Sequence, residues 1–203
     1  MRYLTLLTVL LMCNLSSLAA EPLPSARALV QKTAAQVTSR IRADRPLIDS
    51  NPQHLQSLID ELMMPHIDFQ RMSKWVLGKY WRRASDEQRE QFATEFSQLI
   101  LRTYSTALLE YSDQEVAVLP VRAAADAREV TVRTEVQPDQ GPAIPIAYDL
   151  YLNPQGQWKV YDVSIDGISL IANYRSSFSS QIRRSGISAL LTQLHARNQQ
   201  AIK

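Results

Sequence analysis

Cysteine is nearly absent from this sequence, which has one such residue, Cys13, among 203. It lies in an apolar N-terminal segment, so we expect no disulfide bond to hold the rest of the chain together. The three histidines, His54, His66 and His195, lie far apart, and none has a second histidine or a cysteine at metal-ligand spacing. We therefore expect no zinc site. The fold must be stabilised by its hydrophobic core.

Glycine is also scarce, with five residues. The chain contains neither G-x-x-x-x-G-K-S/T nor G-x-G-x-x-G, and it also lacks G-x-S-x-G. These absences exclude the familiar nucleotide-binding loops and the hydrolase nucleophile turn. Asp149, Asp162 and Asp166 lie on or beside neighbouring predicted strands and could meet as paired carboxylates. Structural hydrogen bonding is the favoured interpretation of these three residues. An enzyme whose site no motif reveals stays an alternative.

No sign of charge dominates, because 22 Lys and Arg residues face 20 Asp and Glu residues, for a net charge of +2. This balance excludes the broad basic surface that nucleic-acid binding needs. We expect no nucleic-acid partner.

Long apolar runs are confined to the N-terminus. Arg2 is followed by an apolar run from Leu4 to Met12 and then by small residues, which are Ser16, Ser17, Ala19 and Ala20. This order is typical of a secretory signal, so we expect residues 1–20 to be a cleaved signal peptide and residues 21–203 to form one domain. A membrane anchor, the alternative, needs about 20 apolar residues. Export without disulfide bonds is common in a bacterial periplasm.

Helical spacing of apolar residues governs the first half of the chain. It predicts helices over residues 25–44, 52–64, 68–77 and 85–111. Pro46 is expected to end the first, and Ser85 with Gln88 forms a capping box at the start of the last. Helical spacing returns from Leu170, with a break at Gly186.

Between these helices the apolar period changes from 3.6 to 2. Alternation predicts antiparallel strands over residues 130–136, 144–152 and 157–165, with a short opening strand at 115–119. The predicted fold class is α+β, a curved antiparallel sheet of about four strands with helices on one face.

Aromatic residues are concentrated where the helices meet the predicted sheet. Trp75, Tyr80 and Trp81 lie within seven positions, and Phe92, Phe96 and Tyr104 follow. Such a cluster is ordinarily core. If the large side chains line the rim of a cone between sheet and helices, an apolar cavity remains inside.

Two sequence blocks resemble the MlaC family of periplasmic phospholipid-binding proteins, also called the toluene-tolerance family. The first is LGKYWRRAS, from Leu77 to Ser85, followed by Gln88 and Phe92. The second is WKVYDVSIDGISL, from Trp158 to Leu170. The resemblance extends from about residue 25 to residue 195, in the same order of elements.

The resemblance implies a nuclear-transport-factor-2-like cone with a helical subdomain that encloses an apolar cavity. It also implies a carrier, not an enzyme, that shuttles phospholipid between an outer-membrane lipoprotein complex and an inner-membrane ABC transporter with its substrate-receiving subunit. Such transport maintains the lipid asymmetry of the outer membrane. The bound phospholipid would be cargo, and no cofactor is expected. A carrier of a hopanoid or sterol-like lipid, or an enzyme on the same cone, are the alternatives.

The acyl chains are expected between the inward face of the strands and the aromatic helices. The expected lining residues are Trp75, Tyr80, Phe92, Phe96, Tyr104, Val132, Ile146, Tyr148, Leu150, Val160 and Ile168. The head group stays at a wet rim, since burial of an unpaired phosphate is costly. The expected rim or partner-docking residues are Lys79, Arg82, Arg83 and Arg89. Head-group preference, transport direction and which strand face is inward stay open.

Overall fold

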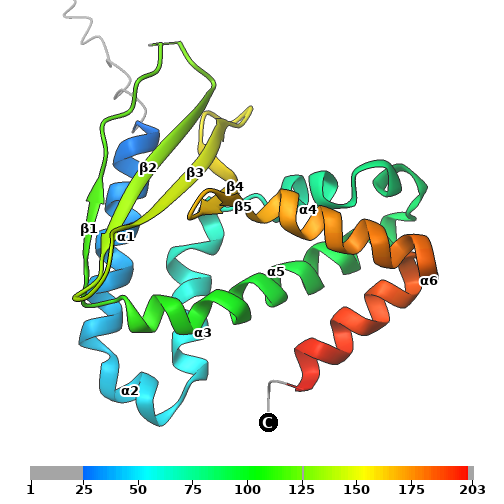
Figure 1. Cartoon of the computed structure of the whole chain (residues 1–203), viewed down its shortest axis with the longest axis horizontal. Helices are drawn as coiled ribbons and strands as arrows, with labels where there is room; N and C mark the ends of the chain where they lie inside the picture. Colours follow the sequence, from blue (N-terminus) through cyan, green and yellow to red (C-terminus); the bar gives the residue numbers. More distant parts are fainter. Residues whose placement is uncertain (1–24, 125, 201–203) are drawn as a thin grey trace, which may run out of the picture.

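The computed structural model describes residues 25–124 and 126–200 of the chain, and the expected signal peptide lies outside them. In this part of the chain, five α-helices precede a five-stranded antiparallel sheet, and a sixth helix follows it (Figure 1). The helices and 3-10 turns before the sheet are α1 (Ala26–Ala43), α2 (Arg45–Ser50), α3 (Gln53–Leu62), η1 (Met64–His66), α4 (Phe69–Leu77), η2 (Gly78–Arg83) and α5 (Asp86–Glu110). The elements that follow are β1 (Glu115–Val118), β2 (Glu129–Gln137), β3 (Ile144–Leu152), β4 (Trp158–Ile165), β5 (Ile168–Ser169) and α6 (Leu170–Gln200).

Side-chain caps set the helix starts. The predicted capping box is confirmed, because Ser85 accepts from the backbone N–H of Gln88 while the Gln88 side chain accepts from that of Ser85. The Asp68 side chain caps α4 by accepting from the backbone N–H of Arg71. The sequence did not predict α2. Pro46 lies in its first turn, where a proline needs no N–H donor, and therefore begins a helix after the first one ends.

The sheet has the order β1-β2-β3-β4-β5, so each strand pairs with its neighbours in the sequence. The predicted α+β class with an antiparallel sheet is confirmed. The alternation along β4 is interrupted, because Asp149 pairs with Asp162 while Leu150 pairs with Val160. Tyr161 is the extra residue of this β-bulge. As a result Val160 and Val163 both pack against the cluster beneath the sheet.

Three clusters of buried apolar residues make the core. One lies between α4, α5 and α6, and its aromatic rings interlock: Phe92 and Phe96 stack at 5.6 Å, and Phe178 meets Phe92 edge-on at 5.8 Å. A second joins α1, α2, α3 and α5. The third joins α1 to the sheet. We call the face of the sheet that contacts α1 the inner face.

Helix α6 turns back on itself at Gly186, where the predicted break is confirmed by a φ of 79° and a ψ of 167°. The second half returns along α5 (Figure 1). It is fixed there by the buried Glu95 carboxylate, which contacts His195 Nδ1 at 2.7 Å and accepts from Asn198 at 2.6 Å. None of the helices described here combines the length and hydropathy needed to cross a membrane.

Candidate functional site

An apolar row crosses the inner face of the sheet from one edge to the other. The strand registers align one residue from each strand: four are apolar, Val118, Ile146, Ile165 and Ile168, and the β2 member is the buried Thr134. Ile146 and Ile165 are half-buried, and Ile168 is 62% exposed. The row is therefore an apolar surface that the helices cover only in part.

Two rows further along β3 the inner face is closed. Leu150 lies between Val130 and Val160, and its side chain is fully buried. Ala26 and Val30 of α1 belong to the same buried cluster. Tyr148 lies in the row between the closed and the open ends and is itself half-buried. Burial raises the pKa of its phenol. Along β3 the inner face thus passes from packed core to a partly open apolar surface.

Helices α5 and α6 provide an aromatic wall at the β4 side of the sheet. Tyr174 meets Phe96 edge-on at 5.3 Å, and both Tyr174 and Tyr104 pack against the α4–α5–α6 cluster. Burial, with a smaller effect of neighbouring Tyr174, raises the pKa of Tyr104. Val163 packs against both this cluster and the α1–sheet cluster. The wall and the inner face of the sheet therefore meet at Val163.

The structure separates the expected tail-lining residues into groups. Val132, Leu150 and Val160 are buried together beneath the sheet, with Tyr148 packed against them. A second group, buried among the helices, contains Tyr80, Phe92 and Phe96, with Tyr104 packed against it.

Three expected residues lie outside both groups. Ile146 lies in the apolar row, and Ile168 lies at the exposed end of that row. Trp75 is 46% exposed and packs against Tyr161 with 5.9 Å between ring centroids, next to the bulge.

Sequence reasoning missed two members of this region. Ile165 joins the inner row because the bulge at Tyr161 shifts the alternation of β4 by one residue. A single sequence carries no clear signal for such a bulge. Tyr174 lies in the Asn173-Tyr174-Arg175 stretch that follows the second sequence block, and its aromatic character was the signal that could have placed it in the wall.

The expected rim cations have different environments. Arg89 is engaged within the chain, since Nε donates to the Trp81 carbonyl at 2.9 Å and NH1 donates to Asp86 at 2.8 Å. Lys79 lies 5.2 Å from the centre of the Tyr80 ring. Arg82 and Arg83 are exposed. The turn η2 that carries Lys79, Arg82 and Arg83 begins at Gly78. The φ of Gly78, 54°, suits glycine, and a Cβ there would come within 3.1 Å of the Arg175 guanidinium.

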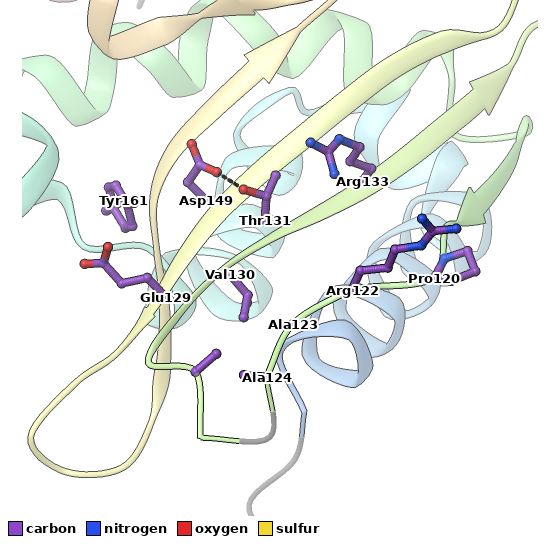
Figure 2. A pocket seen from close by; sticks show the side chains of 11 residues that line it. Pro120, Arg122, Ala123, Ala124, Glu129, Val130, Thr131, Arg133, Asp149 and Tyr161 are labelled. Carbon is purple, nitrogen blue, oxygen red and sulfur yellow. Dashed lines mark hydrogen bonds between the residues drawn. The ribbon is translucent and has the colours of Figure 1, made fainter.

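The opposite, outer face of the sheet carries a polar pocket of about 810 Å³ (Figure 2). Arg122 and Arg133 lie at one side of it, and Glu129, Asp149 and Tyr161 at the other (Figure 2). Asp149 accepts a hydrogen bond of 2.6 Å from Thr131. Such a lining does not suit acyl chains, which need apolar walls. Among the described residues, no three or more His, Cys, Asp or Glu side chains come together as a metal site.

A family model described as MlaC protein matches residues 31–196. The chain belongs to the MlaC family. The intermembrane phospholipid transport system binding protein MlaC of Haemophilus influenzae is 28% identical over 203 residues, covering 99% of this chain and 95% of that protein. The toluene tolerance protein ttg2D of Pseudomonas putida is 30% identical over 159 residues, covering 78% of this chain and 73% of that protein.

One solved structure has a similar fold. It is the phospholipid-binding protein of Ralstonia solanacearum in complex with a phospholipid. It is similar with a TM-score of 0.81 and 36% identity, covering 88% of this chain and 99% of that chain. The resemblance of the two sequence blocks to the MlaC family is therefore confirmed.

Proposed function

We propose that this chain is a periplasmic phospholipid carrier. It moves lipid between an outer-membrane lipoprotein complex and the substrate-receiving subunit of an inner-membrane ABC transporter, and so maintains the lipid asymmetry of the outer membrane. The observation that carries the proposal is the half-buried apolar row on the inner face of the sheet, next to the aromatic wall of α5 and α6. The phospholipid complex of the Ralstonia solanacearum relative supports the choice of ligand.

The physical need for a carrier follows from the acyl chains. Two chains hold roughly 30 methylenes, and exposure of each to water costs about 0.8 kcal/mol, for a total of roughly 24 kcal/mol. Unassisted diffusion through water is negligible at that cost. A protein interior as apolar as the bilayer makes transfer nearly balanced in free energy, so the carrier itself needs neither a nucleotide nor a catalytic group. We accordingly propose no enzymatic activity and no cofactor.

In this proposal the tails lie along the open part of the inner face. Ile146, Ile165 and Tyr148 line the sheet side, Tyr104 lines the helix side, and Ile168 lies at the mouth. The buried residues among the expected set, which are Val132, Leu150, Val160, Tyr80, Phe92 and Phe96, form the walls behind this surface. Trp75 contacts Tyr161 and is left outside the proposed lining.

The head group stays in water at the mouth. The exposed cations of η2 serve partner docking in this proposal. They are Lys79, Arg82 and Arg83, while Arg89 is already bonded to Asp86. Residues 1–20 direct export as a signal peptide.

Purification of the protein from its own cells, organic extraction and mass spectrometry test the proposal. A stoichiometric phospholipid is the expected result. Recovery of a polycyclic lipid would instead identify the cargo as a hopanoid or sterol-like lipid. Protein that is repeatedly empty after native purification, and that takes up no phospholipid from vesicles, would overturn the carrier function.

A further inference from the structure

A buried carboxylate fastens the junction between the last strands and α6. Asp162 on β4 is 9% exposed. Its Oδ1 accepts from the backbone N–H of Val163 at 2.8 Å and from that of Ile171 at 3.2 Å, and its Oδ2 accepts from the Ser169 hydroxyl. The Ser169 oxygen in turn accepts from the backbone N–H of Ala172 at 3.1 Å. One side chain therefore joins β4, β5 and the first turn of α6.

The hydrogen bonds of the Asp162 carboxylate form only while the start of α6 lies against β4, which we call the closed junction. The first turn of a helix leaves N–H groups without intrahelical partners, and a carboxylate beside them satisfies these donors and interacts well with the helix dipole. A buried charge is costly unless it is hydrogen-bonded. Desolvation by burial raises the pKa of Asp162, against the hydrogen bonds from Ser169, Ile171 and Val163 that lower it. The carboxylate thus favours the closed junction through its hydrogen bonds and the helix dipole, which act against the cost of its burial.

The segments that Asp162 joins carry both sides of the mouth. Ile168 immediately precedes Ser169 and pairs with Ile165, so it ends the apolar row. Tyr174 follows one turn after Ile171 and forms part of the aromatic wall against Phe96. Movement of β5 and the first turn of α6 together away from β4 would separate Ile165 of the row from Tyr174 of the wall.

We propose that Asp162 is a positioning residue for lipid uptake and release: it holds β5 and the start of α6 against β4, and detachment of this junction widens the mouth for the acyl chains. The inference rests on the proposed carrier function. It predicts that a weaker junction raises the rate of lipid exchange. Loss of a residue that merely supports the fold would lower stability without raising that rate.

Asp149 provides a matched control. It lies directly opposite Asp162 on β3, but its carboxylate accepts from Thr131 on β2 instead of from α6. Asp149→Ala therefore removes a carboxylate from the same part of the sheet and leaves the junction bonds in place. Ser85→Ala is the second control, because loss of the α5 cap lowers stability by a similar route, a lost side-chain-to-backbone hydrogen bond, without removing a bond of the junction.

The experiment measures transfer of pyrene-labelled phosphatidylglycerol from loaded full-length protein to phosphatidylethanolamine vesicles. Asp162→Ala is expected to release lipid at least three- to tenfold faster than the unaltered protein, since the net loss of a single one of its hydrogen bonds already implies roughly that factor. Asp162→Asn is expected to restore most of the slow rate, because its amide oxygen still accepts from Ile171 and Val163. Asp149→Ala and Ser85→Ala are expected to keep the unaltered rate.

Hydrogen exchange at the Ile171 and Ala172 amides measures opening of the junction in the absence of lipid. We expect this exchange to be faster in Asp162→Ala than in Asp149→Ala. Unchanged exchange, or equal transfer rates in Asp162→Ala and Ser85→Ala, would overturn the inference alone. An unaltered protein that takes up no phospholipid would overturn the carrier function and this inference with it.

Discussion

Ile146 on β3 lies directly opposite Ile165 on β4, and both side chains are half-buried. Ile165 pairs in turn with Ile168 on β5, so the apolar row continues to the exposed edge of the sheet. Two rows away, Leu150 and Val160 pair in the same manner and are buried. The same face of one sheet therefore contains both a packed core and a partly covered apolar surface.

Ile146→Glu tests the open part of this face. The introduced carboxylate is expected to lower bound phospholipid strongly while the protein stays folded, because it competes with the acyl chains and water can solvate it at a half-buried position. Ala147→Glu is the matched control, since Ala147 is the next residue of the strand and points to the opposite face beside Arg133. Lipid per protein is measured by extraction, and folding by circular dichroism. Equal lipid content in the two variants would remove Ile146 from the lining.

Leu150→Ala tests the closed part. We expect unfolding by urea to show a loss of about 2–5 kcal/mol, as is usual when a fully buried leucine is truncated. Lipid bound per folded molecule is expected to change little, because in the proposed arrangement the residue lies behind the tails, in the buried cluster. A loss of stability below about 1 kcal/mol would mean that the cluster with Ala26 and Val30 is not a tightly packed core.

We expect the titration of His66 to make the folding stability depend on pH. Burial, together with the charges of Lys159 and Lys32, lowers the pKa of His66 below its usual value of 6.5. The unfolded chain therefore takes up this proton at a higher pH than the folded chain. The stability that is present above pH 6.5 is lost as the pH falls towards the lower pKa of the folded protein.

His66→Gln should remove this part of the acid sensitivity. Thermal or urea unfolding at a series of pH values between about 7 and 5 measures it for both proteins. A difference in stability between the two proteins that stays constant over this range would contradict the assignment to His66.

The exposed cations of η2 predict a kinetic effect on partner docking. Arg82→Glu with Arg83→Glu is expected to slow association with the proposed inner-membrane partner and to flatten its dependence on salt, because exposed charges act mainly on encounter and are screened over about 10 Å at 0.1 M salt. Lipid occupancy should not change. Arg122→Glu with Arg133→Glu changes the net charge equally on the outer face of the sheet and should leave association fast. If occupancy falls while association holds, these arginines serve the head group.

Much of the fold could be predicted because local rules and tertiary structure agree. The capping box at Ser85, the helix end at Gly78 and the break at Gly186 were all visible as residue patterns, and each is present. The period of two located the strands. Helix α2 was missed because Pro46 fits equally well after one helix or inside the first turn of another.

The candidate site was less predictable than the fold, since it depends on which face each side chain takes. Hydropathy placed Trp75 with the other aromatic residues of its segment, but the structure places it against Tyr161, next to the bulge. That bulge also moves Ile165 into the apolar row. Bulges and helix rotation are set by packing between distant segments, which a single sequence does not contain.

Photocrosslinking measures the position of the acyl chains most directly. A benzophenone amino acid replaces Ile146 in one sample and Ala147 in another, the proteins are loaded with phosphatidylglycerol and irradiated, and the adducts are weighed by intact mass spectrometry. We expect a protein–phospholipid adduct from position 146 and none from position 147. Adducts from position 147, or none from position 146 in protein that carries lipid, would contradict the claim that the inner face of the sheet holds the lipid tails.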